Sequence, residues 1–288
     1  MSRNRIVRWS AALASVLALS TVAADAAQRD GRGNDRGKGR GPDQLLVATT
    51  DSNQLITFNA KNPRDIRSAR VITGLGPNVT LRGIDFRPLT GDLYGVGSDN
   101  IVYRVNQRTA IAIAEGPAYT PASTGKSYGI DFNPVVDKIR VVSDADENLA
   151  LDPDAGTAAV NTALNPAGQM IVGAAYENSS FSAMKPAATT LHVVSAATDQ
   201  LFTQNPPAAG TLTMPRSIRV RGAGPLDVGQ NVGFDIVGAN NLGFLSNVEP
   251  GRGTQLYTLD VPTGRAKSLG QIGRRMTVTG LAAVQDQN

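Results

Sequence analysis

The sequence predicts an all-β fold: a single β-propeller of five four-stranded blades. Two observations predict it. A unit of about 45 residues recurs along the chain, which is the length of a propeller blade. One further copy is split between the two ends of the chain, so that the C-terminal strand completes the N-terminal blade and closes the ring. These features place the propeller in residues 44–288.

Each copy of the unit has the same internal order. A strand of the form Gly-apolar-Asp-apolar comes first, and two apolar strands and a weaker fourth strand follow, separated by turns rich in Gly, Asn and Asp. The copies are marked by their first glycine: Gly83, Gly129 and Gly233 in the clear ones and Gly173 in a fainter one.

The interval from Gly173 to Gly233 is longer than the others, which predicts an insertion in that blade. Two segments are candidates for it, the Pro-rich Asn205–Gly210 and the Arg-rich Arg216–Arg221.

The split copy is recognised by what each end lacks. Leu45–Pro63 contains second and third strands without a first, whereas Gly280–Val284 matches the first strand and nothing follows it. A pair of β-sandwiches is the alternative architecture. It is disfavoured because sandwiches do not ordinarily repeat a whole four-strand unit in register.

Residues 1–26 have the pattern of a secretory signal peptide. Arg3, Arg5 and Arg8 precede an apolar run from Trp9 to Ala24, and an Ala-Asp-Ala site follows. The alternative, an uncleaved anchor, is disfavoured because the run is short and rich in Ala and Ser. No later segment is apolar enough to span a bilayer. We therefore expect an exported protein, periplasmic or extracellular, with no transmembrane segment in the mature chain.

Residues 27–43 form a Gly/Arg-rich segment with no apolar side chain large enough to build a core. We interpret the segment as a flexible linker, although its arginines could also contact anionic lipid, lipopolysaccharide or RNA. The formal net charge of +4 is contributed by the residues before Gln44, which leaves the propeller near neutral. No nucleic-acid partner is expected, because a nucleic-acid-binding domain carries its own basic face.

The chain contains no cysteine. Disulfides, thiol nucleophiles, zinc–thiolate sites and thioether-linked haem are thereby excluded. The single histidine, His192, lies in a predicted second strand between apolar residues, and no Gly-x-Ser-x-Gly elbow is present. We therefore interpret His192 as a structural strand residue and predict no catalytic triad.

Three motifs carry a family resemblance. They are Gly129–Pro134 (GIDFNP), Asp92–Ser98 (DLYGVGS) and Asp137–Thr157, which includes IRVVSDADENLALDPDAGT. In these motifs the chain resembles the bacterial exported family catalogued as domain of unknown function 4394, over Gln44 to about Val284. The resemblance implies a propeller-like fold and an extracytoplasmic location, and it implies no reaction.

Repeated aspartates are the most suggestive candidate site. Asp85, Asp131 and Asp235 occupy the same position in three first strands, and first strands line the channel of a propeller. Three carboxylates on one channel would suit a hard cation such as Ca²⁺, or sugar hydroxyls, or an amine. The alternative is structural: each carboxylate accepts backbone N–H groups and ties neighbouring blades together. In the other two copies the position is occupied by Ala175 and Ala282.

Asp144–Asn148 superficially resembles a calcium loop. It lacks the glycine and the terminal glutamate that such loops need at fixed positions, so we interpret it as a hairpin turn.

These observations leave three functions open. The first is a non-catalytic binding or scaffold module of the cell envelope, acting as a monomer on a protein or glycan ligand through one face or the channel mouth. The second is a metal-assisted hydrolase or lyase that acts on a sugar or lactone through the channel aspartates. The third is a purely structural envelope protein. No catalytic residue and no resident cofactor is identified.

Overall fold

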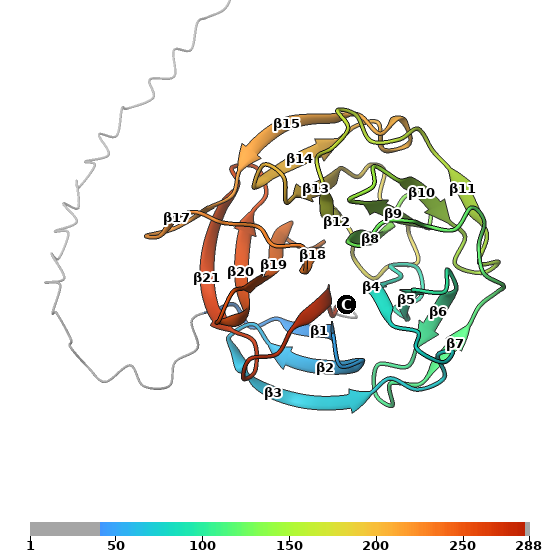
Figure 1. Cartoon of the computed structure of the whole chain (residues 1–288), viewed down its shortest axis with the longest axis horizontal. Coiled ribbons are helices and arrows are strands. Elements are labelled where there is room, and N and C mark those ends of the chain that lie inside the picture. The colour runs from blue at the N-terminus through green and yellow to red at the C-terminus, as the bar shows by residue number, and fades with distance from the viewer. Residues whose placement is uncertain (1–40, 286–288) are drawn as a thin grey trace, which may run out of the picture. The chain divides into compact units, whose positions relative to one another are not determined.

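The computed structural model describes residues 41–285, which belong to one compact unit of the chain. Five antiparallel sheets stand around a central axis, as Figure 1 shows. The prediction of a five-bladed propeller is confirmed. The predicted signal peptide and nearly all of the predicted linker lie outside the described residues.

Blades 1 to 3 are regular four-stranded sheets in which the strands follow one another from the axis outward. Blade 1 contains β22 (Val278–Ala283), β1 (Leu45–Thr50), β2 (Gln54–Asn59) and β3 (Asn62–Val71). Blade 2 contains β4 (Leu81–Phe86), β5 (Leu93–Gly97), β6 (Val102–Val105) and β7 (Ala112–Ala114). Blade 3 contains β8 (Tyr128–Asn133), β9 (Lys138–Ser143), β10 (Asn148–Leu151) and β11 (Ala158–Val160).

Blades 4 and 5 keep this order of four strands and add further elements to it. Blade 4 contains β12 (Ile171–Tyr176), β13 (Leu191–Ser195), β14 (Gln200–Gln204) and β15 (Leu212–Ser217), with the 3₁₀ turn η1 (Pro207–Ala209) between the last two. Blade 5 contains β18 (Val232–Val237), β19 (Leu242–Glu249), β20 (Gly253–Asp260) and β21 (Arg265–Gln271). A small hairpin, β16 (Arg219–Val220) and β17 (Gly224–Pro225), extends the outer edge of blade 5.

The extra length predicted between Gly173 and Gly233 lies in two places. One is the hairpin of β16 and β17, which begins within the predicted segment Arg216–Arg221. The other is the connection 177–190 between β12 and β13, which was not predicted from the sequence; the equivalent connection in blade 3 is only 134–137.

The ring is closed by antiparallel pairing between the two ends of the propeller. Leu46 lies opposite Ala283 and Ala48 opposite Leu281, which joins β1 to β22 as predicted. Because Leu46, Ala48 and Leu281 are also buried, closure adds core as well as hydrogen bonds.

The core lies between neighbouring blades. The cluster between blades 2 and 3 is representative, because Tyr94 and Val96 of one blade pack with Phe132 and Ile139 of the next. The rings of Tyr94 and Phe132 meet edge to face, with centroids 5.4 Å apart and planes at 73°. Alternate residues of each strand therefore face opposite blades, as the two-residue period of a strand requires.

Among residues 41–285, no helix has the length and apolar character needed to cross a membrane.

Candidate functional site

The innermost strand of each blade brings one glycine to the axis: Gly83, Gly129, Gly173, Gly233 and Gly280. A Cβ on Gly129 would lie 2.5 Å from the backbone N of Ala174, and one on Gly233 would lie 2.5 Å from Cβ of Leu281. The missing side chains therefore allow the inner strands to approach closely. The space enclosed at this level is about 10 Å³, room for about one water.

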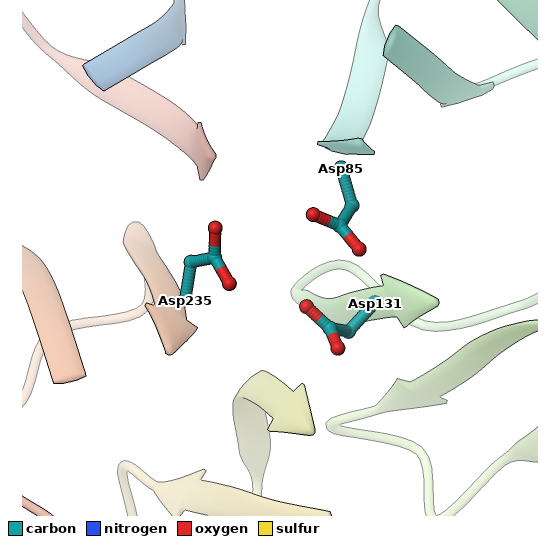
Figure 2. A group of neighbouring side chains, drawn as sticks. All are labelled: Asp85, Asp131 and Asp235. Atoms are coloured by element: carbon teal, nitrogen blue, oxygen red, sulfur yellow. The ribbon is translucent and has the colours of Figure 1, made fainter. Parts of the chain in front are cut away.

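Two residues after the glycine, three inner strands carry the predicted aspartates. Asp85 comes from β4, Asp131 from β8 and Asp235 from β18, and Figure 2 shows their carboxylates turned toward the shared axis. One oxygen of each lies within 4.8 Å of the others, and the residues are only 4%, 1% and 5% exposed. The fold thus brings together all three residues singled out in the sequence.

Each carboxylate also reaches the inner strand of the following blade, where it accepts a backbone N–H. The three bonds are Phe132 N to Asp85 Oδ2 (2.7 Å), Tyr176 N to Asp131 Oδ2 (2.8 Å) and Ala283 N to Asp235 Oδ2 (2.6 Å). The other oxygens of Asp85 and Asp235 accept the N–H of the next residue in their own strands, Phe86 and Ile236. The aspartates therefore join blade 2 to 3, blade 3 to 4 and blade 5 to 1.

Burial penalises the charged form of these acids. The pKa of Asp85 is raised well above its ordinary value, mainly by burial and secondly by the negative charge of Asp235. The pKa of Asp131 is also raised well above its ordinary value, mainly by burial and secondly by the negative charge of Asp85. Burial raises the pKa of Asp235 to about 7 despite its two backbone hydrogen bonds. Such a cluster can hold shared protons, or a hard cation that would replace them.

The two ends of the channel differ. We name the end where the inner strands begin the upper mouth and the end where they finish the lower mouth. Residues 177–190, which we name the strap, leave blade 4 at the lower mouth. Asn178 exchanges hydrogen bonds with Asn241 of blade 5, and Ser182 N donates to Pro88 O of blade 2 at 3.0 Å. The strap therefore runs from blade 4 along blade 5 and reaches blade 2 at the lower end of the channel.

The upper mouth holds a cavity of about 300 Å³. Its lining comes from blades 1, 2, 3 and 5: Thr80, Leu81, Arg82, Ser98, Gly125, Lys126, Ser127, Tyr128, Gln230, Asn231, Val232 and Thr279. None of the three aspartates lines it, because they lie further along the inner strands, beyond the glycine ring.

Arg82 is held in this cavity by several contacts. Its guanidinium group lies over the Tyr128 ring, 4.6 Å from the centroid. It donates to Asn100 Oδ1 (2.7 Å), Ser98 O (3.1 Å) and Tyr119 Oη (3.3 Å). Its position is therefore fixed by contacts within the protein.

The acids of the predicted hairpin turn have structural partners. Asp144 accepts Lys126 N at 2.8 Å, Asp146 accepts Gly168 N with both oxygens at 3.0 Å, and Glu147 accepts Thr124 N at 2.6 Å. Residues 144–147 thus form the turn between β9 and β10, and the carboxylates of this turn fasten neighbouring loops.

His192 is a buried strand residue, 5% exposed. Its Nε2 lies 3.1 Å from Glu177 Oε1, and its Nδ1 lies 3.2 Å from a guanidinium nitrogen of Arg216. Burial lowers the pKa of His192. Because an arginine can only donate, Nδ1 accepts and the proton of the neutral ring is on Nε2, facing Glu177.

Arg82 and Tyr128 were not predicted as site residues from the sequence. A signal existed, because both immediately precede the repeated glycine, the position that faces the upper mouth. Val232 and Thr279 occupy this position in blades 5 and 1 and also line the cavity. The repeat alone did not reveal this cavity, because only the closed ring brings the four positions together.

Two solved structures are similar to the chain at low sequence identity. A protein of unknown function from Bacteroides thetaiotaomicron is 14% identical with a TM-score of 0.49, covering 82% of this chain and 60% of that one. TolB from Acinetobacter baumannii is 11% identical with a TM-score of 0.45, covering 79% of this chain and 53% of that one. The chain thus spans about three fifths or less of either relative. No curated protein matches it in sequence.

A family model matches residues 54–282, which is most of the propeller, and its description is "Domain of unknown function (DUF4394)". This match includes the Gly-x-Asp inner strands of blades 2, 3 and 5 and agrees with the resemblance seen in the motifs. The chain therefore belongs to the DUF4394 family.

Proposed function

We propose that this protein is an exported, non-catalytic binding module of the cell envelope that holds a small ligand at the upper mouth of its propeller. The N-terminal sequence supports export, since it has the order of segments found in signal peptides. The near-neutral propeller supports a small-molecule or glycan ligand over nucleic acid.

The observation that carries the proposal is the upper-mouth cavity. Ligand sites are concave, largely preformed, and supplied with a few fixed polar groups that set orientation. The cavity of about 300 Å³ lies where loops of four blades converge, and Arg82 is fixed in it by Tyr128 and three hydrogen bonds. Loops on a rigid scaffold are where binding residues gather.

The second candidate is a metal-assisted hydrolase or lyase, favoured by the three carboxylates within 4.8 Å. Two observations weigh against it. Backbone N–H groups already donate to both carboxylate oxygens of Asp85, to both of Asp235 and to one of Asp131. The cluster also lies below a glycine ring with room for about one water, so a sugar or lactone at the upper mouth would not reach it.

Thermal unfolding of the purified protein against sugars, amino acids and nucleotides tests the proposal, because a ligand that binds only the native state raises the midpoint. Any stabilising ligand is then tested on Asn231→Trp. Asn231 is exposed and lines the cavity, so an indole there would fill the mouth.

Val136→Trp is the matched control. Val136 is 54% exposed on the turn after β8, toward the other end of the channel. The proposal requires that Asn231→Trp abolish the stabilisation while Val136→Trp retains it. A ligand that stabilises both variants equally would bind elsewhere and overturn the proposal.

A further inference from the structure

We infer that the upper-mouth cavity binds a hydroxylated acid of sugar size, a ligand in which a carboxylate or phosphate group stands beside several hydroxyl groups. The inference rests on the proposed function, because it takes the upper mouth as the ligand site, and it adds the chemical class of the ligand.

The charge of the lining indicates an anion. Its charged side chains are Arg82 and Lys126, and no aspartate or glutamate is among the lining residues. Asp144 and Glu147, on the turn after β9, accept backbone N–H groups of residues 124–126 and so hold the loop that forms one wall. A ligand anion would therefore meet cations directly, without displacing a resident carboxylate.

Arg82 has the features of a built anion receptor. All of its hydrogen-bond acceptors are neutral, namely an amide oxygen, a backbone carbonyl and a phenol. Within residues 41–285 it forms no salt bridge. Its contacts do not use every N–H of the guanidinium group, and stacking on Tyr128 fixes the plane of the rest. A planar, preorganised guanidinium is the group that best matches a carboxylate or phosphate.

The remaining polar lining suits hydroxyl groups. Hydroxyl and amide side chains line the cavity together with the arginine: Thr80, Ser98, Ser127, Gln230, Asn231 and Thr279. Each of these side chains can both donate and accept, as hydroxyl groups of a ligand require. The volume of about 300 Å³ is at the small end of ligand pockets, which fits one sugar ring better than an extended polymer.

Calorimetric titration with three probes tests the inference: galacturonate, its neutral counterpart galactose, and inorganic phosphate. We expect galacturonate to bind about tenfold or more tightly than galactose, the difference that a charge-assisted hydrogen bond supplies. Phosphate should bind more weakly than galacturonate, because it lacks the hydroxyl contacts.

Arg82→Gln should remove the preference for galacturonate over galactose, and Lys126→Gln, at an exposed position, should reduce it. Arg108→Gln is the control, since Arg108 is an exposed arginine on the turn between β6 and β7. Thermal unfolding of each variant separates loss of binding from loss of fold, and Lys126→Gln keeps the test valid if Arg82→Gln does not fold.

The outcomes separate this inference from the proposed function. One outcome is that galacturonate and galactose bind with equal affinity, that Arg82→Gln leaves both affinities unchanged and that Asn231→Trp abolishes both. This outcome would overturn the inference that the ligand is an acid, while the proposal that a ligand binds at the upper mouth would stand. Phosphate binding as tightly as galacturonate would reduce the site to an anion site without sugar recognition and also overturn the inference. Failure of both anions to bind overturns it too, and the ligand screen then decides the proposed function independently.

Discussion

Asp131 of blade 3 accepts a hydrogen bond from the backbone N–H of Tyr176 in blade 4, at 2.8 Å, while its carboxylate stays in the group formed with Asp85 and Asp235. The same side chain thus fastens two blades and adds to a buried cluster of acids. These two roles oppose each other energetically, because the hydrogen bond favours ionisation whereas burial and the neighbouring carboxylates disfavour it.

Substitution of Asp131 separates the two roles. Asp131→Ala removes the acceptor of Tyr176 N and should cost about 1–3 kcal/mol, the penalty of an unpaired buried donor. Asp131→Asn keeps an acceptor oxygen, removes the charge and can donate to Asp85, so its stability near neutral pH should equal or exceed that of the natural chain. Urea unfolding measures the stability of both variants. Asp65→Asn is the control, because Asp65 is exposed. A large loss in the asparagine variant would mean that the charge itself is needed.

The dependence of stability on pH follows from the raised pKa values. An acid with a higher pKa in the folded chain binds protons preferentially there, so its contribution is fully present below the unfolded pKa and is lost as the pH rises through the folded pKa. For Asp235 this window runs from the ordinary value of 3.8 to about 7. We therefore expect the aspartate cluster to make the free energy of unfolding larger at about pH 5 than at about pH 8, by about 2 kcal/mol or more. Asp235→Asn should flatten this dependence, and an equally steep profile in that variant would assign it to other groups.

Addition of a divalent cation distinguishes shared protons from a metal. If the aspartates serve as blade fasteners, the thermal midpoint should be the same in EDTA and with Ca²⁺, Mg²⁺ or Mn²⁺ added. A cation that binds only the folded state would instead add about 2.7 kcal/mol at a hundredfold excess over its Kd. A rise of several degrees that disappears in Asp131→Ala would place a cation on the axis and restore the metal-assisted enzyme as a candidate.

The sequence was sufficient for the ring and for the equivalent positions of the three aspartates in it, because both follow from a repeat. Once Gly83 and Gly129 mark equivalent strands, the positions two residues later, Asp85 and Asp131, must occupy the same level of the channel. The strap could not be predicted in this way, since residues 177–190 have no counterpart in the other blades and their contacts with Pro88 and Asn241 depend on the closed ring. The cation–π contact of Arg82 with Tyr128 crosses from blade 2 to blade 3 and likewise requires the ring geometry.

The glycine ring makes a prediction that depends on what each added methyl group would meet. Gly129→Ala would bring Cβ to 2.5 Å from backbone atoms of Gly173 and Ala174, which cannot move without shifting a strand. The nearest atoms to a Cβ on Gly83 would belong to the Ile130 side chain, at 3.0 Å and beyond. We expect a loss of about 2–3 kcal/mol or more for Gly129→Ala and a smaller loss for Gly83→Ala, measured by urea unfolding. Equal losses would contradict the close approach of the inner strands as the reason for the repeated glycine.

A buried ion pair between blades provides the last prediction. Arg87 of blade 2 donates to Asp137 and Asp154 of blade 3, each pair reaching 2.6 Å, and the side chains of Arg87 and Asp137 are 8% and 11% exposed. Arg87→Ala would leave Asp137 buried without its partner, so we expect a loss of about 3 kcal/mol or more in the free energy of unfolding. The control is Arg104→Ala, because the Arg104–Glu115 bridge lies within blade 2 and its arginine is 47% exposed; that change should cost about 1 kcal/mol or less. The ratio of the two losses is the decisive quantity. If Arg87→Ala is as mild as Arg104→Ala, then blades 2 and 3 are held together by their apolar core and by the bond from Phe132 to Asp85, and the ion pair adds nothing to them.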